Sequence, residues 1–214
     1  MKIKSLSYIL IESTNLESWE AYARDVVGLM KNNDLSNENN LFFRMDESPF
    51  RFQVQKGDSD RYARGGFELE NKEAFEEAKK ELSNLGIEVA IESEELAQVR
   101  CVEELLSFDD PAGNTLELFY GRGIDTNEFK SSQDISKFVT HGLGLGHLVF
   151  GTLEVEAAHD FYKEVMNFGD SDIMRMRFSP DPDDPESVLY FMHCDNPRHH
   201  TVAMMQAPTP PSGL

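Results

Sequence analysis

The sequence predicts an α+β protein built from three tandem modules, each consisting of a strand, a helix and three further strands (βαβββ). The main observation is an internal repeat. SLSYILIESTNLESWEAYARDVVGL (residues 5–29) aligns without a gap with GLGHLVFGTLEVEAAHDFYKEVMNF (residues 144–168). A second observation is that a segment between the two copies has the same order of strand, helix and hairpin. Repeats of this size indicate modules that bury their apolar faces against one another.

The first module is expected near residues 4–57. After its opening strand, four large side chains recur at the spacing of one helix face (i, i+3, i+7, i+8): Trp19, Tyr22, Val26 and Val27. This pattern predicts an amphipathic helix. The runs NLFFRMD and RFQVQKG that follow are rich in apolar and aromatic residues and predict further strands.

The middle module is expected near residues 64–121, with GGFELEN as a strand and KEAFEEAKKELSNLG as a helix that ends at Gly86. ELLSFDDPAGNTLELFYG then reads as a hairpin with a Pro-Ala-Gly turn. The third module, near residues 143–207, repeats the order of the first and continues with the strands SVLYFMHCD and HTVAMMQA. Two modules make a complete pair, whereas the third has no partner in this sequence. The expected division is therefore an N-terminal domain (1–125), a linker (126–142) and half of a second domain (143–214).

Composition excludes some classes of partner. The sequence has 39 acidic and 20 basic residues, a formal charge of −19, whereas nucleic acids and anionic membranes require a basic face. No apolar run approaches the ~20 residues of a membrane helix, and the N-terminus lacks the apolar segment of a signal peptide. Cys101 and Cys194 lie far apart and outside any CxxC pattern, as expected of free thiols. We therefore expect a cytoplasmic protein with neither a nucleic acid nor a membrane as partner.

All six histidines lie at or after residue 141. His147 is on the opening strand of the third module, where the first module has Tyr8. The reason for a histidine at this position is therefore local to the third module. It is read either as a buried core residue or as a ligand. His141 is expected in a solvated loop, and His159 on the solvent face of a helix.

The segment HCDNPRHH contains a turn between two predicted strands. Side chains alternate along a strand, so His199 and His200 should point to opposite faces, and His200 should share the inward face with Val202 and Met204. His147 and His200 would then approach each other inside one curved sheet. Two such imidazoles suit a metal, a proton relay, or both.

Several stretches together carry a family resemblance: the repeat copy at 5–29, LFFRMDESPFRFQV, ELAQVRCVEELLSFDDPAGNTLELFYG, GLGHLVF with FYKEVMNFGDSD, and FMHCDNPRHHT. They resemble the type I extradiol ring-cleavage dioxygenases of the vicinal oxygen chelate superfamily, specifically the 2,3-dihydroxybiphenyl 1,2-dioxygenase group. The resemblance implies two domains of two βαβββ modules each. It also implies Fe(II) held by two histidines and one glutamate in the C-terminal domain, with a catechol-type substrate cleaved by O2 in aromatic-compound degradation. A homo-oligomer is implied for the full-length protein.

The resemblance also implies roles for individual residues. His147 matches the first histidine ligand, His200 the histidine that contacts substrate and acts as acid and base, and Phe191 a residue that lines the substrate pocket. The remaining histidine and glutamate ligands would belong to a fourth module beyond PTPPSGL, and Glu117 marks by analogy the strand that would carry the glutamate. We therefore expect the chain to be an inactive fragment of a longer enzyme.

Two alternatives remain open. Another metal-dependent member of the superfamily, such as a glyoxalase-like isomerase or a thiol transferase, would share the repeat and the first histidine. It would not need NPRHH or the N-terminal domain without metal. A non-catalytic protein that only binds a small molecule or a partner subunit would also share the fold. Iron content and oxygen uptake with a catechol distinguish both from a dioxygenase.

Overall fold

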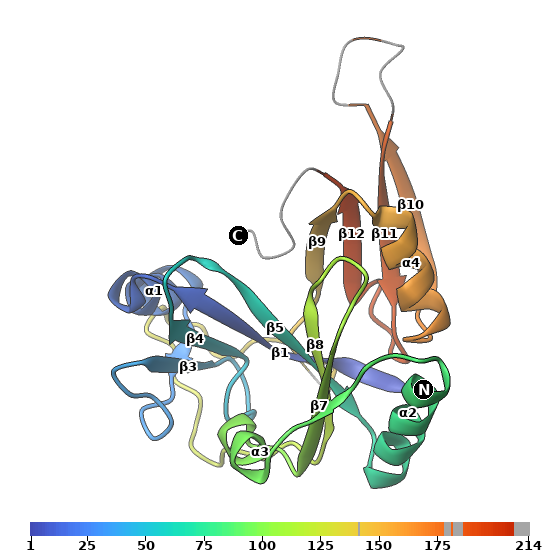
Figure 1. Cartoon of the computed structure of the whole chain (residues 1–214). Helices are drawn as coiled ribbons and strands as arrows, with labels where there is room; N and C mark the ends of the chain where they lie inside the picture. Colours follow the sequence, from blue (N-terminus) through green and yellow to red (C-terminus); the bar gives the residue numbers. More distant parts are fainter. Residues whose placement is uncertain (141, 178–180, 182–185, 208–214) are drawn as a thin grey trace.

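The computed structural model describes residues 1–140, 142–177, 181 and 186–207. It confirms the predicted α+β class with tandem βαβββ modules. The strands form an eight-stranded sheet in the order β2-β3-β4-β1-β5-β8-β7-β6 and a four-stranded sheet in the order β10-β11-β12-β9 (Figure 1). His141 and the segment PTPPSGL (208–214) lie outside the described residues.

The first module supplies half of the eight-stranded sheet. Its elements are β1 (Ile3–Ser13), α1 (Leu16–Tyr22), a π-helical turn (Ala23–Val27), β2 (Met30–Lys31), β3 (Asn40–Arg44) and β4 (Phe52–Lys56). Helix α1 begins after Asn15 because the side-chain oxygen of Asn15 accepts a hydrogen bond from the Ser18 N–H at 2.9 Å. The π-helical turn ends at Gly28, whose φ of 80° is a left-handed conformation that favours glycine.

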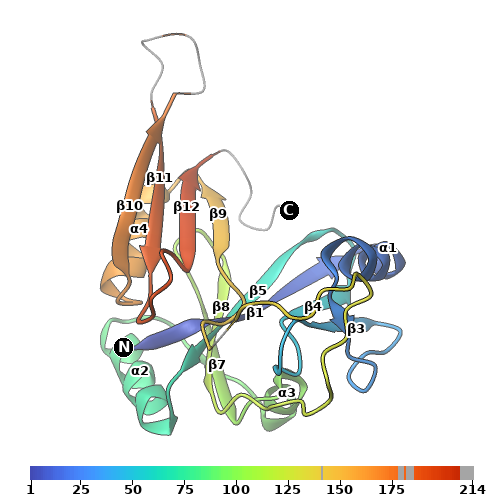
Figure 2. The same ribbon diagram turned by 180° about the vertical axis from the view of Figure 1, so that it is seen from behind.

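The middle module supplies the other half, and the third module forms the four-stranded sheet. The middle module consists of β5 (Arg61–Leu69), α2 (Lys72–Asn84), β6 (Ala90–Ile91), α3 (Glu94–Arg100), β7 (Glu104–Asp109) and β8 (Thr115–Tyr120). The third consists of β9 (Leu148–Thr152), α4 (Val155–Glu164), β10 (Gly169–Met176), β11 (Ser187–His193) and β12 (Val202–Gln206). Figure 2 shows the connection from β8 to β9 running along the first two modules before it reaches the third.

Strand pairing repeats from module to module. The opening and last strands pair in parallel in each: β1 with β4, β5 with β8, and β9 with β12. Ile9 is opposite Phe52 in the first module, and Leu148, its counterpart in the gapless alignment, is opposite Val202 in the third. The internal repeat is therefore a repeat of strand pairing as well as of sequence. The eight-stranded sheet is joined by antiparallel pairing of β1 with β5.

One apolar cluster joins the two sheets. Helix α2 contributes Phe75 and Leu82, and helix α4 contributes Phe161 and Tyr162. The hydroxyl of Tyr162 also donates a hydrogen bond to the Asp110 carboxylate at 3.1 Å, which links α4 to the turn after β7. The third module thus packs on the first two through its helix-bearing face, and the opposite face of its sheet points away from this core.

Asp110 should make the stability of the chain depend on pH. Burial raises the pKa of its carboxyl, because the charged form is disfavoured away from water. The unfolded chain therefore releases this proton at a lower pH than the folded chain. Asp110 stabilises the fold below the unfolded pKa of about 3.9 and loses that contribution as pH rises through its raised folded pKa.

The variant Asp110→Asn isolates this effect. Its free energy of unfolding, measured with urea from about pH 4 upward, should fall less with rising pH than that of the unchanged protein. Identical pH dependence in the two proteins would show that Asp110 does not titrate across this range.

Candidate functional site

The imidazoles of His147 and His200 lie together at one end of the third-module sheet. His147 directly precedes β9, and His200 lies two residues before β12. Their ring centroids are 4.3 Å apart, with the ring planes inclined at 51°. The parallel pairing of β9 with β12 explains this proximity, because both residues enter the same end of neighbouring strands. The expected approach of the two rings is confirmed.

The face of the sheet on which they meet differs from the prediction. The row of Leu148, Val202 and Met192 is buried on the helix side, and Met204 is also in the core. The neighbouring row of Val149, Ala203 and Phe191 points the other way, and Val149 is 58% exposed.

His200 lies with this second row, since its ring centroid is 5.1 Å from that of Phe191. The expectation that His200 shares a face with Val202 and Met204 was wrong. The chain bends over residues 195–199, so the alternation of the strand does not extend back to His200. The two imidazoles and Phe191 therefore lie on the open face of the sheet.

The surroundings of both imidazoles lower their pKa values. Partial burial lowers the pKa of His147, and the positive charge of Arg198 lowers it further. Burial also lowers the pKa of His200, with added repulsion from His147, His199 and Arg198. Both shifts therefore favour the neutral form of the rings. A neutral imidazole has one nitrogen lone pair free to bind a metal or accept a proton.

A complete iron site requires more than these residues. Non-haem Fe(II) is typically held by two histidines and one carboxylate. Within the described ranges, no group of three or more His, Cys, Asp or Glu side chains is close enough to hold a metal ion. The described part of the chain therefore does not fit a whole Fe(II) site, although His147 offers one nitrogen ligand.

The first two modules contain a buried ionic cluster at the corresponding place. Tyr8, which aligns with His147, donates a hydrogen bond from its hydroxyl to Glu117 at 2.6 Å. The guanidinium of Arg100 donates to the two Glu117 oxygens at 3.0 and 3.2 Å. Glu117 is fully buried, and burial raises the pKa of Tyr8 well above its ordinary value. Arg100 thus supplies the positive charge that Glu117 requires.

The first two modules should consequently fold without metal. Thermal unfolding of a fragment ending at Gly123, followed with and without a chelator such as EDTA, should give coincident curves. The reason is that the guanidinium of Arg100, at hydrogen-bond distance, already compensates the negative charge of Glu117. A large loss of thermal stability in chelator would contradict this assignment.

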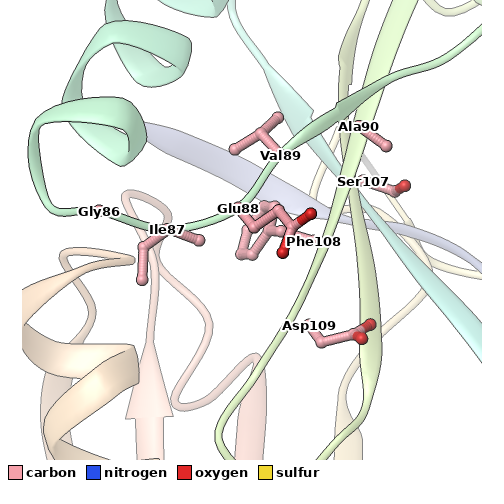
Figure 3. Close-up of a pocket in the computed structure, with 8 residues that line it drawn as sticks. All are labelled: Gly86, Ile87, Glu88, Val89, Ala90, Ser107, Phe108 and Asp109. Atoms are coloured by element: carbon pink, nitrogen blue, oxygen red, sulfur yellow. The ribbon is translucent and has the colours of Figure 1, made fainter.

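The pocket shown in Figure 3 lies apart from the histidines. It has a volume of about 470 Å³ and is lined by the segment after α2 and by part of β7. Val89 and Phe108 provide apolar wall, and Glu88 and Asp109 provide carboxylates. With no imidazole or cation in its lining, this pocket lacks the chemistry predicted for the site.

One histidine of the third module contradicts the sequence-based expectation. His159 was expected to face water, but it is buried, stacks on Tyr190 with a centroid distance of 4.0 Å and lies 2.6 Å from Asp170 Oδ1. Sequence reasoning also missed Asn196 and Arg198 as neighbours of the site. The Asn-Pro turn was visible in HCDNPRHH, but the distant partners of these two side chains were not.

Comparisons with known proteins agree with this architecture. Residues 6–57 match the family model described as dihydroxybiphenyl dioxygenase BphC D1. The chain is 37% identical to an iron-dependent extradiol dioxygenase of Rhodococcus jostii (strain RHA1), a match covering 100% of this chain and 71% of that protein. It is 33% identical to the biphenyl-2,3-diol 1,2-dioxygenase of Paraburkholderia xenovorans (strain LB400), with 98% of this chain and 69% of the relative covered.

A solved structure shows the same arrangement. The crystal structure of a catechol 2,3-dioxygenase superimposes with a TM-score of 0.89 at 30% identity, covering 97% of this chain and 68% of that chain. Fold and sequence define an extradiol ring-cleavage dioxygenase of the vicinal oxygen chelate superfamily. The chain belongs to this family, in the dihydroxybiphenyl dioxygenase group, and spans about two thirds of the length of these relatives.

Proposed function

We propose that this chain is part of an Fe(II)-dependent extradiol dioxygenase that opens a catechol-type ring with O2. The observation that carries the proposal is the pair of imidazoles, His147 and His200, beside Phe191 on the open face of the third-module sheet. Family membership supports the reaction class. The expected substrate resembles 2,3-dihydroxybiphenyl, since relatives are named for biphenyl-2,3-diol.

Each residue has a proposed role. His147 would be one nitrogen ligand of iron, whose chemistry when bound is to hold catechol and dioxygen in contact and to pass electron density between them. The ring of His200, 4.3 Å from that of His147, would hydrogen-bond the reacting oxygen atoms and move a proton at its free nitrogen. Phe191 would form an apolar wall for the aromatic ring of the substrate.

The wider organisation follows the same proposal. Residues 1–125 would form an N-terminal domain without metal, 126–142 a linker, and 143–214 part of the catalytic domain. The missing carboxylate and second histidine ligand would lie outside this chain, and the full-length protein would assemble as a homo-oligomer in the cytoplasm. No helix in the described part of the chain is long and apolar enough to cross a membrane.

The test is oxygen uptake together with ring opening. The complete protein, loaded anaerobically with Fe(II), should consume about one O2 per 2,3-dihydroxybiphenyl and form a yellow ring-opened product. A glyoxalase-like isomerase would turn over its own substrate without consuming oxygen. A non-catalytic binding protein would consume neither oxygen nor the catechol. Absence of oxygen uptake with any catechol tested, at full iron occupancy, would overturn the proposal.

A further inference from the structure

Strand β1 has an edge that its own sheet leaves partly uncovered. On one side β1 pairs with β5 along most of its length. On the other side β4 pairs only with residues 9–13. The first half of β1 therefore presents backbone carbonyls that no strand of the eight-stranded sheet covers, and exposed strand edges of this kind readily accept hydrogen bonds.

Two segments of the third module occupy this edge. The N–H of Leu145, two residues before His147, donates to the Leu6 carbonyl at 2.8 Å. The N–H of Asp195 donates to the Ile3 carbonyl at 3.0 Å. The side-chain amide of Asn196, four residues before His200, donates to the Lys4 carbonyl at 2.8 Å. Both segments that lead to the imidazoles are thus bound to the same stretch of β1.

The approach to β1 is close at the first of these segments. Gly144 has a φ of 73°, and a Cβ atom there would lie 2.0 Å from the Leu6 carbonyl oxygen. Only glycine suits this position, because any side chain would collide with backbone. The path of the chain into His147 is therefore determined by contact with β1.

Arg198 connects the two segments to each other. Its Nε donates to the Leu143 carbonyl at 3.1 Å, which ties the turn before His200 to the segment before His147. Its backbone N–H donates to Asn196 Oδ1 at 2.9 Å. Asn196 therefore uses both ends of its side-chain amide: the nitrogen donates to β1 and also to Cys194 Sγ at 3.1 Å, and the oxygen accepts within the turn.

We propose that the uncovered edge of β1 sets the relative placement of His147 and His200, with Asn196 as the positioning residue for His200. The first module, which has no histidine, thereby takes part in building the site of the third. The importance of this placement for catalysis rests on the proposed dioxygenase function. The placement itself can be tested without turnover.

The chain contains a matched control. The side-chain amide of Asn167 donates to the Met1 carbonyl at 3.0 Å, so it is a second asparagine that links the third module to the N-terminal backbone. Asn167 follows α4 and makes no contact with either imidazole among the interactions described above. Asn196→Asp and Asn167→Asp each remove one amide donor, add one negative charge and conserve side-chain size. In Asn196→Asp the oxygen that accepts from Arg198 is kept.

The experiment is NMR on this 214-residue chain without metal. The unchanged protein should show a nuclear Overhauser effect between the ring protons of His147 and His200. Asn196→Asp should lose this signal, and amide exchange at Asp195, whose N–H binds β1 beside the lost contact, should accelerate roughly 2- to 10-fold, as expected for loss of one hydrogen bond. Asn167→Asp should retain the signal and the protection of the Asp195 amide.

Amide protection along β1 and β5 serves as the folding control and should be retained in both variants. An inter-ring signal that persists in Asn196→Asp, or that disappears equally in both variants, would overturn the proposal. The inter-ring signal depends on the placement of the two rings and not on activity. An inactive complete protein would therefore refute the proposed function without affecting the conclusion about ring placement.

Discussion

Replacing His200 by alanine in the complete, iron-loaded enzyme should lower the ring-opening rate by about 10²–10⁴-fold, the range expected for loss of a general acid or base. Bound iron should remain at the level of the unchanged protein, because His200 is assigned to proton movement and not to iron binding. The imidazole beside His147 and Phe191 is the physical basis of this expectation. The measurement is the initial rate of product formation at saturating O2, with iron determined on the same samples.

His199→Ala is the matched control. Its Nδ1 lies 3.1 Å from that of His200, but its side chain is exposed, so its removal should have a much smaller effect on the rate. Equal losses in the two variants would indicate that the turn, and not the imidazole of His200, is what catalysis requires.

Breaking the buried ionic cluster of Tyr8, Arg100 and Glu117 should strongly lower the free energy of unfolding of the chain. Arg100→Met leaves the Glu117 carboxylate without its main partner in a position that is 0% exposed. Removing one member of a buried ion pair typically costs about 3–5 kcal/mol. Urea unfolding of the chain, followed by circular dichroism, should show a loss of this size.

The comparison is Arg61→Met, which removes the partner of Glu12 in an ion pair where the arginine is exposed. This variant should change the free energy of unfolding little, because exposed pairs contribute little to stability. If Arg100→Met lowered the free energy of unfolding no more than Arg61→Met, the guanidinium of Arg100 would not stabilise the cluster.

Much of this fold could be predicted from sequence because the internal repeat reveals its tandem modules. The gapless match of residues 5–29 with 144–168 identified two copies of one module. Hydrophobic spacing indicated a helix in the first copy, but its predicted apolar face was partly wrong, because Tyr22 and Val26 are exposed and the α-helix ends at Tyr22. The repeat also isolated His147, since Tyr8 stands in its place in the first copy. In the structure, Tyr8 fills this place with a hydrogen bond to Glu117 that needs no metal.

Other features could not be predicted because they depend on contacts between distant residues. Alternation placed His200 on the face of Val202 and Met204, since the sequence did not show that the strand begins only at Val202. His159 was expected in water because its stacking partner, Tyr190, lies on a strand well beyond it in the chain. The role of Asn196 depends on Lys4, in a different module, and no local pattern indicates that contact.

The most direct test of His147 as an iron ligand is the iron content of the complete protein with and without this imidazole. After anaerobic loading with Fe(II) and removal of excess metal, the unchanged protein and His200→Ala should each retain about one iron per chain. His147→Ala should retain almost none and show no ring opening, because the site has lost one of its three protein ligands. Full iron content and full activity in His147→Ala would contradict the account and make His147 a structural residue of the sheet.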